Sequence, residues 1–286
     1  MPVQISGSTL EGLGNIPKNA DSSYQYLLVR LLLGTATVSR GSARGKQSTD
    51  YSSLPAVAQN KSPAVAVNEF LTSYSIGGSV ARFIKVTRSD NRDFYKEILS
   101  EFLNFYLQTL QGRNTSAFIF LYRILERISY SVPLLYASTQ SDYRNTFKDL
   151  KAILNGDNAG ELGLFRKFLA QGKFIDSIKL QVTQSISFDP SSVYGASYYD
   201  LTCKKFNNFT GTDQAARKVE IRFSDIPDFL VTIRNRFFHS LIGDGKENIT
   251  TIDMPDSDEY FGKINPIIVS FLAIVALHTI SAKYHI

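Results

Sequence analysis

The chain has 286 residues, a formal net charge of +5, three histidines and one cysteine, Cys203. A single cysteine excludes an intrachain disulfide and a cysteine-based metal cluster, which suits a reducing cytoplasm. The length accommodates one substantial core with a smaller lobe. Because the first residues lack a basic region followed by an apolar run, we expect no secretory signal and a cytoplasmic protein.

The excess of basic residues is confined to the first 88 positions. Nine of the 31 Lys and Arg residues and four of the 26 Asp and Glu residues fall there, so residues 89–286 hold 22 of each sign. This bias is compatible with a polyanionic partner such as RNA, and solubility alone would explain it equally well. Gly45 and Lys46 lack the spacing of a phosphate-binding loop, so we exclude a nucleoside triphosphatase.

The N-terminal segment, residues 1–88, is predicted to be poorly ordered or loosely packed. Residues 1–23 and 34–64 are rich in Ser, Gly, Thr, Asn and Ala, and they cannot order themselves by burial alone. The apolar run at 24–33 is expected to be a buried strand or short helix. A strand is predicted at 81–86.

The main domain, residues 89–286, is predicted to be mainly α-helical. A helix over 89–111 begins near Ser89 or Asp90 and breaks at Gly112. A clearer amphipathic helix covers 115–136, and Pro133 is expected to bend its end. The apolar side of this second helix comprises Phe118, Leu121, Leu125, Ile128, Val132 and Leu135. Shorter helices are predicted at 142–154 and 161–171.

A small β-containing insertion is predicted at about 174–223. Its aromatic residues surround Lys204 and Lys205, a composition that suits either core packing of a small sheet or stacking of nucleic-acid bases. We favour packing. The predicted strands lie at 185–188, 198–199 and 219–223.

The C-terminal part is predicted to contain an acidic loop at 244–263 and a buried helix at 264–280. Polar residues interrupt the apolar run of this helix, which is shorter than a membrane span, so we expect no membrane partner. The loop lacks a regular calcium-binding spacing, and His278 and His285 have no grouped ligand partners, so we expect no metal site.

A well-delimited helix is predicted over residues 226–242. Ser224 or Asp225 offers a side-chain oxygen to its first turn, where Pro227 is tolerated. Gly243 supplies a left-handed stop. One apolar stripe, spaced by three and four residues, faces the core and comprises Ile226, Phe229, Leu230, Ile233, Phe237 and Leu241.

The opposite face of this helix is polar and unusual. Arg234 lies between the two faces, and Asn235 and His239 are one helical turn apart. A helix with an apolar stripe and such a second face is expected to bury both. The second face comprises Asp228, Thr232, Asn235 and His239, with Val231 and Phe238 beside them.

The segment from Arg234 to His239 resembles the signature of the HEPN ribonuclease superfamily, an Arg followed by a small polar residue, with a His after four to six intervening residues. Here the polar residue is Asn235 and four residues intervene. The resemblance implies an HEPN-like helical bundle in which this motif lies on a late helix.

The resemblance also implies metal-independent RNA cleavage without a cofactor. The ribose 2′-hydroxyl attacks the adjacent phosphate, His239 moves the proton, and Arg234 holds the phosphoryl oxygens. Asn235 orients His239 or contacts a phosphate oxygen. We expect substrate-binding residues next to this pair: Arg236, Arg123, Glu126 and Tyr130.

Three of these residues share the polar side of the helix at 115–136. Glu126 can reach Arg123 and Tyr130 by helical spacing. A solvated, salt-bridged face is one interpretation, and the more usual one for a helix. The other is that this face flanks the catalytic pair, as an early polar helix does in many HEPN domains.

A homodimer is expected from the geometry of the motif. Arg234 and His239 are five residues apart and about 140° out of phase on a straight helix, so one copy cannot easily present both to one phosphate. Two copies related by a twofold axis can. Val231, Asn235 and Phe238 are expected at or beside the subunit boundary with His239.

Stand-alone bacterial members of the superfamily resemble toxins or antiviral-defence effectors that are held inactive by a partner. The resemblance therefore implies RNA as substrate and a regulatory or antitoxin protein as a further partner. The alternative is a non-catalytic HEPN-like helical subunit that docks a partner protein or RNA, in which Arg234 and His239 only form hydrogen bonds.

Overall fold

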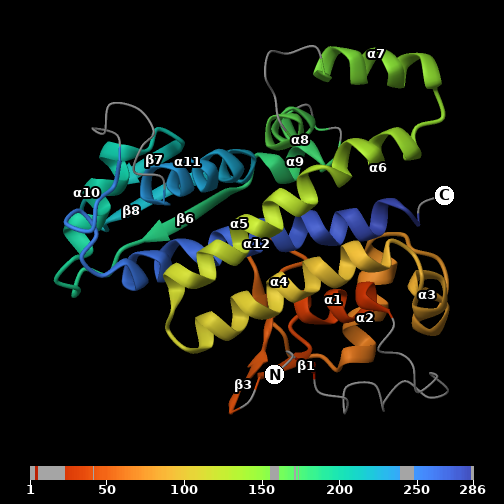
Figure 1. The fold of residues 1–286 in the computed structure, drawn as a ribbon, viewed down its shortest axis with the longest axis horizontal. Coiled ribbons are helices and arrows are strands. Elements are labelled where there is room, and N and C mark those ends of the chain that lie inside the picture. The colour runs from red at the N-terminus through yellow and green to blue at the C-terminus, as the bar shows by residue number, and fades with distance from the viewer. Residues whose placement is uncertain are drawn as a thin grey trace.

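The computed structural model describes residues 4–5, 23–40, 42–154, 161–170, 172, 174–238 and 248–284. The described chain is mainly α-helical with small antiparallel sheets, which confirms the predicted fold class. Figure 1 shows one long helix, α12 (Ser257–Ala282), running through the middle of the molecule. The other elements surround it.

Helix α12 is the core of the protein. It is long and apolar enough to cross a membrane, but 89% of its most apolar window is buried inside the protein. This burial confirms the predicted buried C-terminal helix. It begins at Ser257 rather than near 264, because Asp256 caps its first turn and Tyr260 and Phe261 extend its buried surface.

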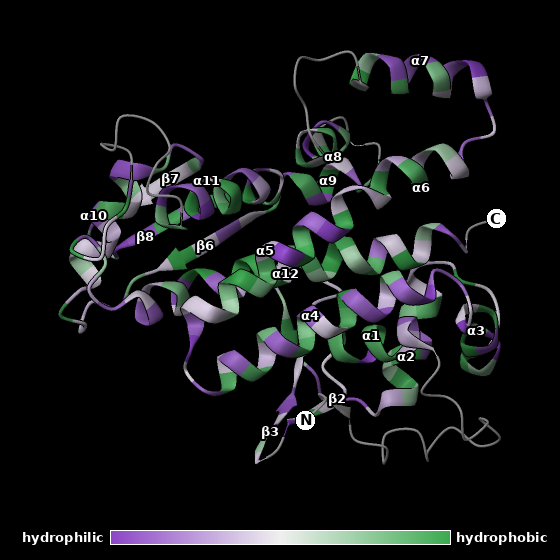
Figure 2. Cartoon of the chain, viewed as in Figure 1, coloured by the Kyte–Doolittle hydropathy of each residue, from purple (hydrophilic) through white to green (hydrophobic). Residues whose placement is uncertain are grey.

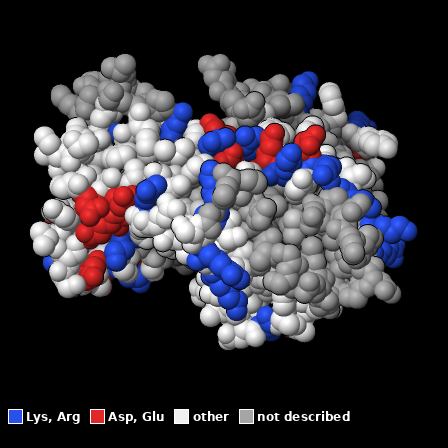
Figure 3. Space-filling view, turned by 60° about the horizontal axis from the view of Figure 1, so that its bottom comes forward, with Lys and Arg blue, Asp and Glu red and all other residues white. Residues whose placement is uncertain are grey.

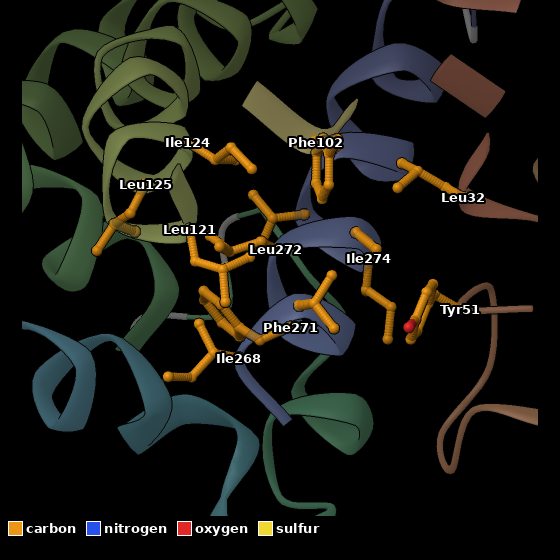
Figure 4. Close-up of a cluster of buried hydrophobic side chains, with 14 of the residues drawn as sticks. Leu32, Tyr51, Phe102, Leu121, Ile124, Leu125, Ile268, Phe271, Leu272 and Ile274 are labelled. Atoms are coloured by element: carbon orange, nitrogen blue, oxygen red, sulfur yellow. The ribbon is translucent and has the colours of Figure 1, made fainter. Parts of the chain in front are cut away.

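Two helices form one wall around α12. Helix α4 (Arg92–Leu110) and helix α5 (Asn114–Ser129) contact each other, and α5 also contacts α12. Figure 2 shows α12 as a largely hydrophobic helix within the fold. Figure 4 shows side chains of α5 meeting those of α12. The labelled residues of α5 are Leu121, Ile124 and Leu125, and those of α12 are Ile268, Phe271, Leu272 and Ile274. Leu32, Tyr51 and, from α4, Phe102 lie on the other side of α12.

The boundaries of the predicted helices are partly revised. Helix α4 confirms the helix at 89–111, but its N-cap is Asn91, since Asp90 is instead paired with Lys283. The helix predicted at 115–136 divides into α5 and α6 (Ser131–Thr139) at Tyr130. Pro133 lies in the first turn of α6, where a residue without a backbone N–H is tolerated. In a continuous helix the same residue would remove one backbone hydrogen bond, which favours the end of α5 before it.

Residues 23–87 pack on this wall. Helix α1 (Tyr24–Leu32) is almost wholly buried and contacts α4 and α12, which confirms the predicted buried element and places it in the same core. The small sheet β1–β2–β3 lies against α4 and has no core of its own. Its strands and the neighbouring elements are β1 (Gln4–Ile5), β2 (Ala36–Arg40), β3 (Ala43–Gln47), β4 (Thr49–Asp50), β5 (Val57–Ala58) and α2 (Pro63–Ser73).

The predicted strand at 81–86 is wrong, because this segment is helix α3 (Val80–Thr87). Its buried residues are Val80, Phe83, Ile84 and Thr87, which follow helical spacing rather than alternation. The Ser79 hydroxyl accepts a hydrogen bond from the backbone N–H of Arg82 and starts the helix. Residues 1–3 and 6–22 lie outside the described residues.

The insertion contains a three-stranded antiparallel sheet, which confirms its predicted β content. The strand order is β6–β8–β7. Tyr198 and Tyr199, predicted to be in a strand, lie in a helix, because Tyr198, Tyr199 and Thr202 bury one side of it with helical spacing. The elements are α9 (Ser177–Leu180), β6 (Thr183–Ser187), α10 (Gly195–Lys205), β7 (Phe209–Asp213) and β8 (Lys218–Arg222).

The other predicted helices are present. Helix α7 (Tyr143–Leu154) and helix α8 (Glu161–Ala170) match the predictions at 142–154 and 161–171. The motif helix, α11 (Ile226–Phe238), follows a 3-10 turn at Phe223–Asp225. His239 and the predicted stop at Gly243 lie outside the described residues.

Candidate functional site on helices α5 and α11

The core side of α11 confirms the predicted apolar stripe. Ile226, Phe229, Leu230 and Ile233 are fully buried. Phe229 packs against two aromatic rings of the insertion, at 5.0 and 5.6 Å between ring centroids. This supports core packing as the role of these aromatic residues. Phe237 is half-buried and Leu241 lies outside the described residues.

The other side of α11 lies along α5, and two ring contacts join the helices. Phe238 stacks on Phe118 with ring centroids 5.8 Å apart, and the Arg234 guanidinium carbon lies 4.9 Å from the centre of the Tyr122 ring. The residues are four apart on each helix and pair in reverse order. Therefore α5 and α11 run antiparallel at this contact.

Arg234 is half-buried and is held by two neutral groups. Its Nη1 donates a hydrogen bond to the Asn235 side-chain oxygen at 3.0 Å, while the Tyr122 ring receives one face of the guanidinium. Among the residues that the structure describes, no carboxylate forms an ion pair with Arg234. The predicted contact between Asn235 and His239 lies outside the described residues.

Tyr122 is the residue of this site that the sequence did not single out. It lies one helical turn before Glu126 on α5, and its ring faces the Arg234 guanidinium. Burial, together with the Glu126 charge, raises the pKa of Tyr122 above the usual value for a phenol, and Arg234 opposes this. Tyr122 is therefore a neutral donor at physiological pH. The spacing of Tyr122 and Glu126 was the available signal.

Two of the predicted substrate-binding residues face α4 instead of α11. Arg123 pairs with Glu101 of α4 at 2.9 Å, and the ring of Tyr130 packs edge-on against Phe94 at 5.7 Å. Arg127 joins the same group through Glu101 at 3.3 Å. The expected contacts of Glu126 with Arg123 and Tyr130 are not formed among the described residues, because residues of α4 hold both Arg123 and Tyr130.

Arg236 is occupied by the insertion. It donates a hydrogen bond to the Lys205 backbone carbonyl and lies 5.8 Å from the Phe206 ring, and its own carbonyl accepts from the Ile249 N–H at 2.8 Å. Lys205 in turn donates to the Asn248 carbonyl at 3.2 Å. Arg236 therefore connects α11 to the end of α10 and to Ile249, which follows α11 in the chain.

The remaining residues of the predicted second face are partly covered within the chain. Asp228 forms an ion pair with Arg166 of α8, and Val231 packs against the core. Phe238 keeps 38% of its surface exposed despite its contact with Phe118. Part of the face that was expected to meet a second subunit is thus covered by α5 and α8.

The charge on the face of the molecule drawn in Figure 3 is mixed. Figure 3 shows a band of alternating basic and acidic side chains on one face, with a separate group of basic side chains near the middle of the view. Within the described residues no group of three or more His, Cys, Asp or Glu side chains is arranged to hold a metal ion.

Comparisons of the chain with models of protein families, with curated proteins and with solved structures gave no match.

Proposed function

We propose that the chain is a cytoplasmic, metal-independent endoribonuclease whose reaction is carried by Arg234, Asn235 and His239. The observation that supports this most is the state of Arg234. Its guanidinium is fixed by an amide and an aromatic ring, and no described carboxylate neutralises it. A charge held in this way can bind two oxygens of a phosphate.

The chemistry divides between the three residues. Neutral His239 takes the proton of the ribose 2′-hydroxyl, whose oxygen attacks the adjacent phosphorus. Arg234 stabilises the charge that grows on the phosphoryl oxygens. The 5′-oxygen leaves and takes up the proton that His239 has accepted, so the products are a 2′,3′-cyclic phosphate and a 5′-hydroxyl and the imidazole is neutral again. Asn235 fixes the guanidinium through its side-chain oxygen.

The active form is proposed to be a homodimer. On a straight helix, residues five apart in sequence, as Arg234 and His239 are, lie about 140° apart, so we propose that Arg234 of one copy and His239 of the other share each phosphate. The exposed part of Phe238 marks the side of α11 that is open to such a contact. The motif further supports a role as a toxin or antiviral-defence effector that a regulatory protein restrains.

The direct test is RNA cleavage by the purified protein in EDTA, with the product ends mapped. We expect cleavage, 2′,3′-cyclic phosphate ends, and no cleavage of a substrate with a 2′-deoxyribose at the scissile position. Arg234→Ala and His239→Ala should each lower the rate at least about 100-fold. Arg222→Ala, on the exposed end of β8, is the matched control and should cleave as the natural protein does.

The shared site has its own test. Equal amounts of Arg234→Ala and His239→Ala, refolded together, form mixed dimers in which one of the two sites holds both residues. We expect part of the activity to return. No recovery, or an active monomer by light scattering, would remove the composite site but leave the ribonuclease proposal standing.

A non-catalytic docking subunit is the second candidate. The internal partners of Arg236 and Asp228 favour it, since they commit polar groups of α11 to the fold. A folded protein that leaves RNA intact under all these conditions would make it the better explanation.

A further inference from the structure

We propose that helix α7 binds single-stranded RNA on its exposed face, with bases stacked on Tyr143 and Phe147 and phosphates paired with the basic side chains beside them. The inference rests on the proposed ribonuclease function, since it assigns a second contact to the RNA substrate. Figure 1 shows α7 at the edge of the molecule, apart from α11. The surface is therefore distinct from the site around Arg234.

Two aromatic rings of α7 are open to solvent. Tyr143 keeps 86% of its surface exposed and Phe147 keeps 67%, more than any other aromatic side chain that the structure describes. The two residues are four apart, so their rings lie one turn apart on the same side of the helix. Single apolar residues on a surface are normal, whereas neighbouring ones favour an interaction site.

Three basic side chains continue this face. Arg144, Lys148 and Lys151 are all exposed. At about 100° per residue, the two rings and these three residues together span about 140° of the helix surface. No carboxylate of the described chain forms an ion pair with any of the three. The face is thus aromatic along one edge and positively charged along the other.

The acidic residues of this region are used inside the fold. The Asp142 carboxylate accepts hydrogen bonds from the backbone N–H groups of Arg144 and Asn145, both at 3.0 Å, and so caps the first turn. The Asp149 carboxylate accepts a hydrogen bond from the Tyr136 hydroxyl of α6 at 2.5 Å. By helical spacing Asp149 lies on the side away from the rings. The exposed face therefore presents positive charge.

The inner side of α7 holds the exposed face outward. Ile153 is buried, and its carbonyl accepts a hydrogen bond from the Lys167 ammonium of α8 at 3.0 Å. Thr146 is buried on the same side. Because α8 anchors this side, the rings and cations are presented by a fixed helix.

The composition of the face favours single-stranded RNA as its ligand. Proteins that bind single strands combine basic groups that follow the backbone with aromatic side chains on which bases stack. A duplex keeps its bases stacked on each other, so these rings would gain little from it. A lipid surface requires a wide apolar helix face, and here Ile153 is buried and Leu150 half-buried in the fold.

Binding of a fluorescent, single-stranded 2′-O-methyl oligonucleotide by the full chain tests this, because such a strand has no 2′-hydroxyl that can attack. Tyr143→Ala/Phe147→Ala removes both rings and should raise Kd at least about tenfold. Tyr143→Phe/Phe147→Tyr keeps two aromatic faces and should bind within about twofold of the natural protein. Ile178→Ala, whose side chain is 75% exposed on α9, is the matched control and should bind as the natural protein does.

The basic residues should give a different signature. Each phosphate contact with a single strand contributes about 0.7 to the slope of log Kd against log salt. Lys148→Gln/Lys151→Gln should therefore lower the slope by about 1.4, whereas loss of the rings should leave it unchanged. A slope that is the same with and without the two lysines would overturn the assignment of phosphates to this face.

Three results with the ring variant Tyr143→Ala/Phe147→Ala would overturn the inference. The first is an unchanged Kd for the oligonucleotide. The second is a change in molecular mass by light scattering, which would identify the face as a subunit contact. The third is loss of binding to anionic lipid vesicles with RNA binding intact. Thermal unfolding should be the same in all variants, because the replaced side chains are exposed.

Cleavage separates this inference from the proposed function. On a long single-stranded RNA the ring variant should raise KM and leave kcat unchanged, because a remote contact binds substrate and transition state equally. A protein that binds the oligonucleotide through α7 but never cleaves RNA would refute the ribonuclease and leave the RNA-binding surface standing. A protein that cleaves RNA and binds it equally well without the rings would do the reverse.

Discussion

The two sides of helix α5 (Asn114–Ser129) differ in what they require of the sequence. The side toward α12 is apolar, with Leu121, Ile124 and Leu125 fully buried. The side toward α11 carries Phe118 and Tyr122, whose rings contact Phe238 and Arg234 one to one. The first side tolerates exchange among apolar residues of similar volume, while the second depends on individual atoms. The core and the proposed site therefore occupy different sides of one helix.

The largest effect is expected in the core. Phe271 of α12 is fully buried and packs against Phe165 and Phe223. Phe271→Ala should lower the free energy of unfolding by about 3–5 kcal/mol, because it leaves a cavity. Denaturant titration measures this. Phe147→Ala, whose ring is 67% exposed on α7, should change it by less than about 0.5 kcal/mol. Equal losses would show that α12 does not organise the core.

Alkaline pH should weaken the core before it affects the site. Burial raises the pKa of Tyr95 and of Tyr260 well above the usual value. Both phenols are neutral in the folded and unfolded protein below about pH 10, so their stabilisation is complete there. Above it only the unfolded form ionises, and stability is lost as pH rises toward the folded pKa.

The expected loss is about 1 kcal/mol for each of these tyrosines between pH 10 and 11, or about 2 kcal/mol for the pair, because the unfolded phenol is only half ionised at about pH 10. Denaturant titrations at about pH 9, 10 and 11 measure this loss of stability. Tyr95→Phe should reduce the slope. A stability that is flat over this range would contradict the buried placement of the two phenols.

A smaller effect is expected where α12 and α5 begin. The Asp258 carboxylate of α12 accepts a hydrogen bond from the Thr115 N–H of α5 at 2.7 Å, which caps one helix from another. Asp258→Ala should cost about 1 kcal/mol. Asp258→Asn keeps an acceptor and should cost less. Thermal unfolding compares the two, and an Asp258→Ala protein as stable as the natural one would show that the cap contributes nothing.

The sequence by itself determined the longest helices. Periodic apolar residues located α4, α5 and α11, because a helix repeats its buried face every three or four residues, and a long apolar run located α12. The prediction failed at 81–86 and at Tyr198–Tyr199, because a short apolar run is compatible with either a strand or a helix. In both segments packing against the core stabilises the helix. The prediction also missed the break at Tyr130.

The site was only partly visible in the sequence. The pattern from Arg234 to His239 is local and could be read directly, as could the i to i+4 spacing of Tyr122 and Glu126. What each side chain touches was decided by folding. Arg123 forms an ion pair with Glu101, Arg236 donates a hydrogen bond to the Lys205 carbonyl, and Arg234 lies over the Tyr122 ring. These partners are distant in the chain, and their contacts arise only when packing brings the helices together, since no local rule of spacing encodes them.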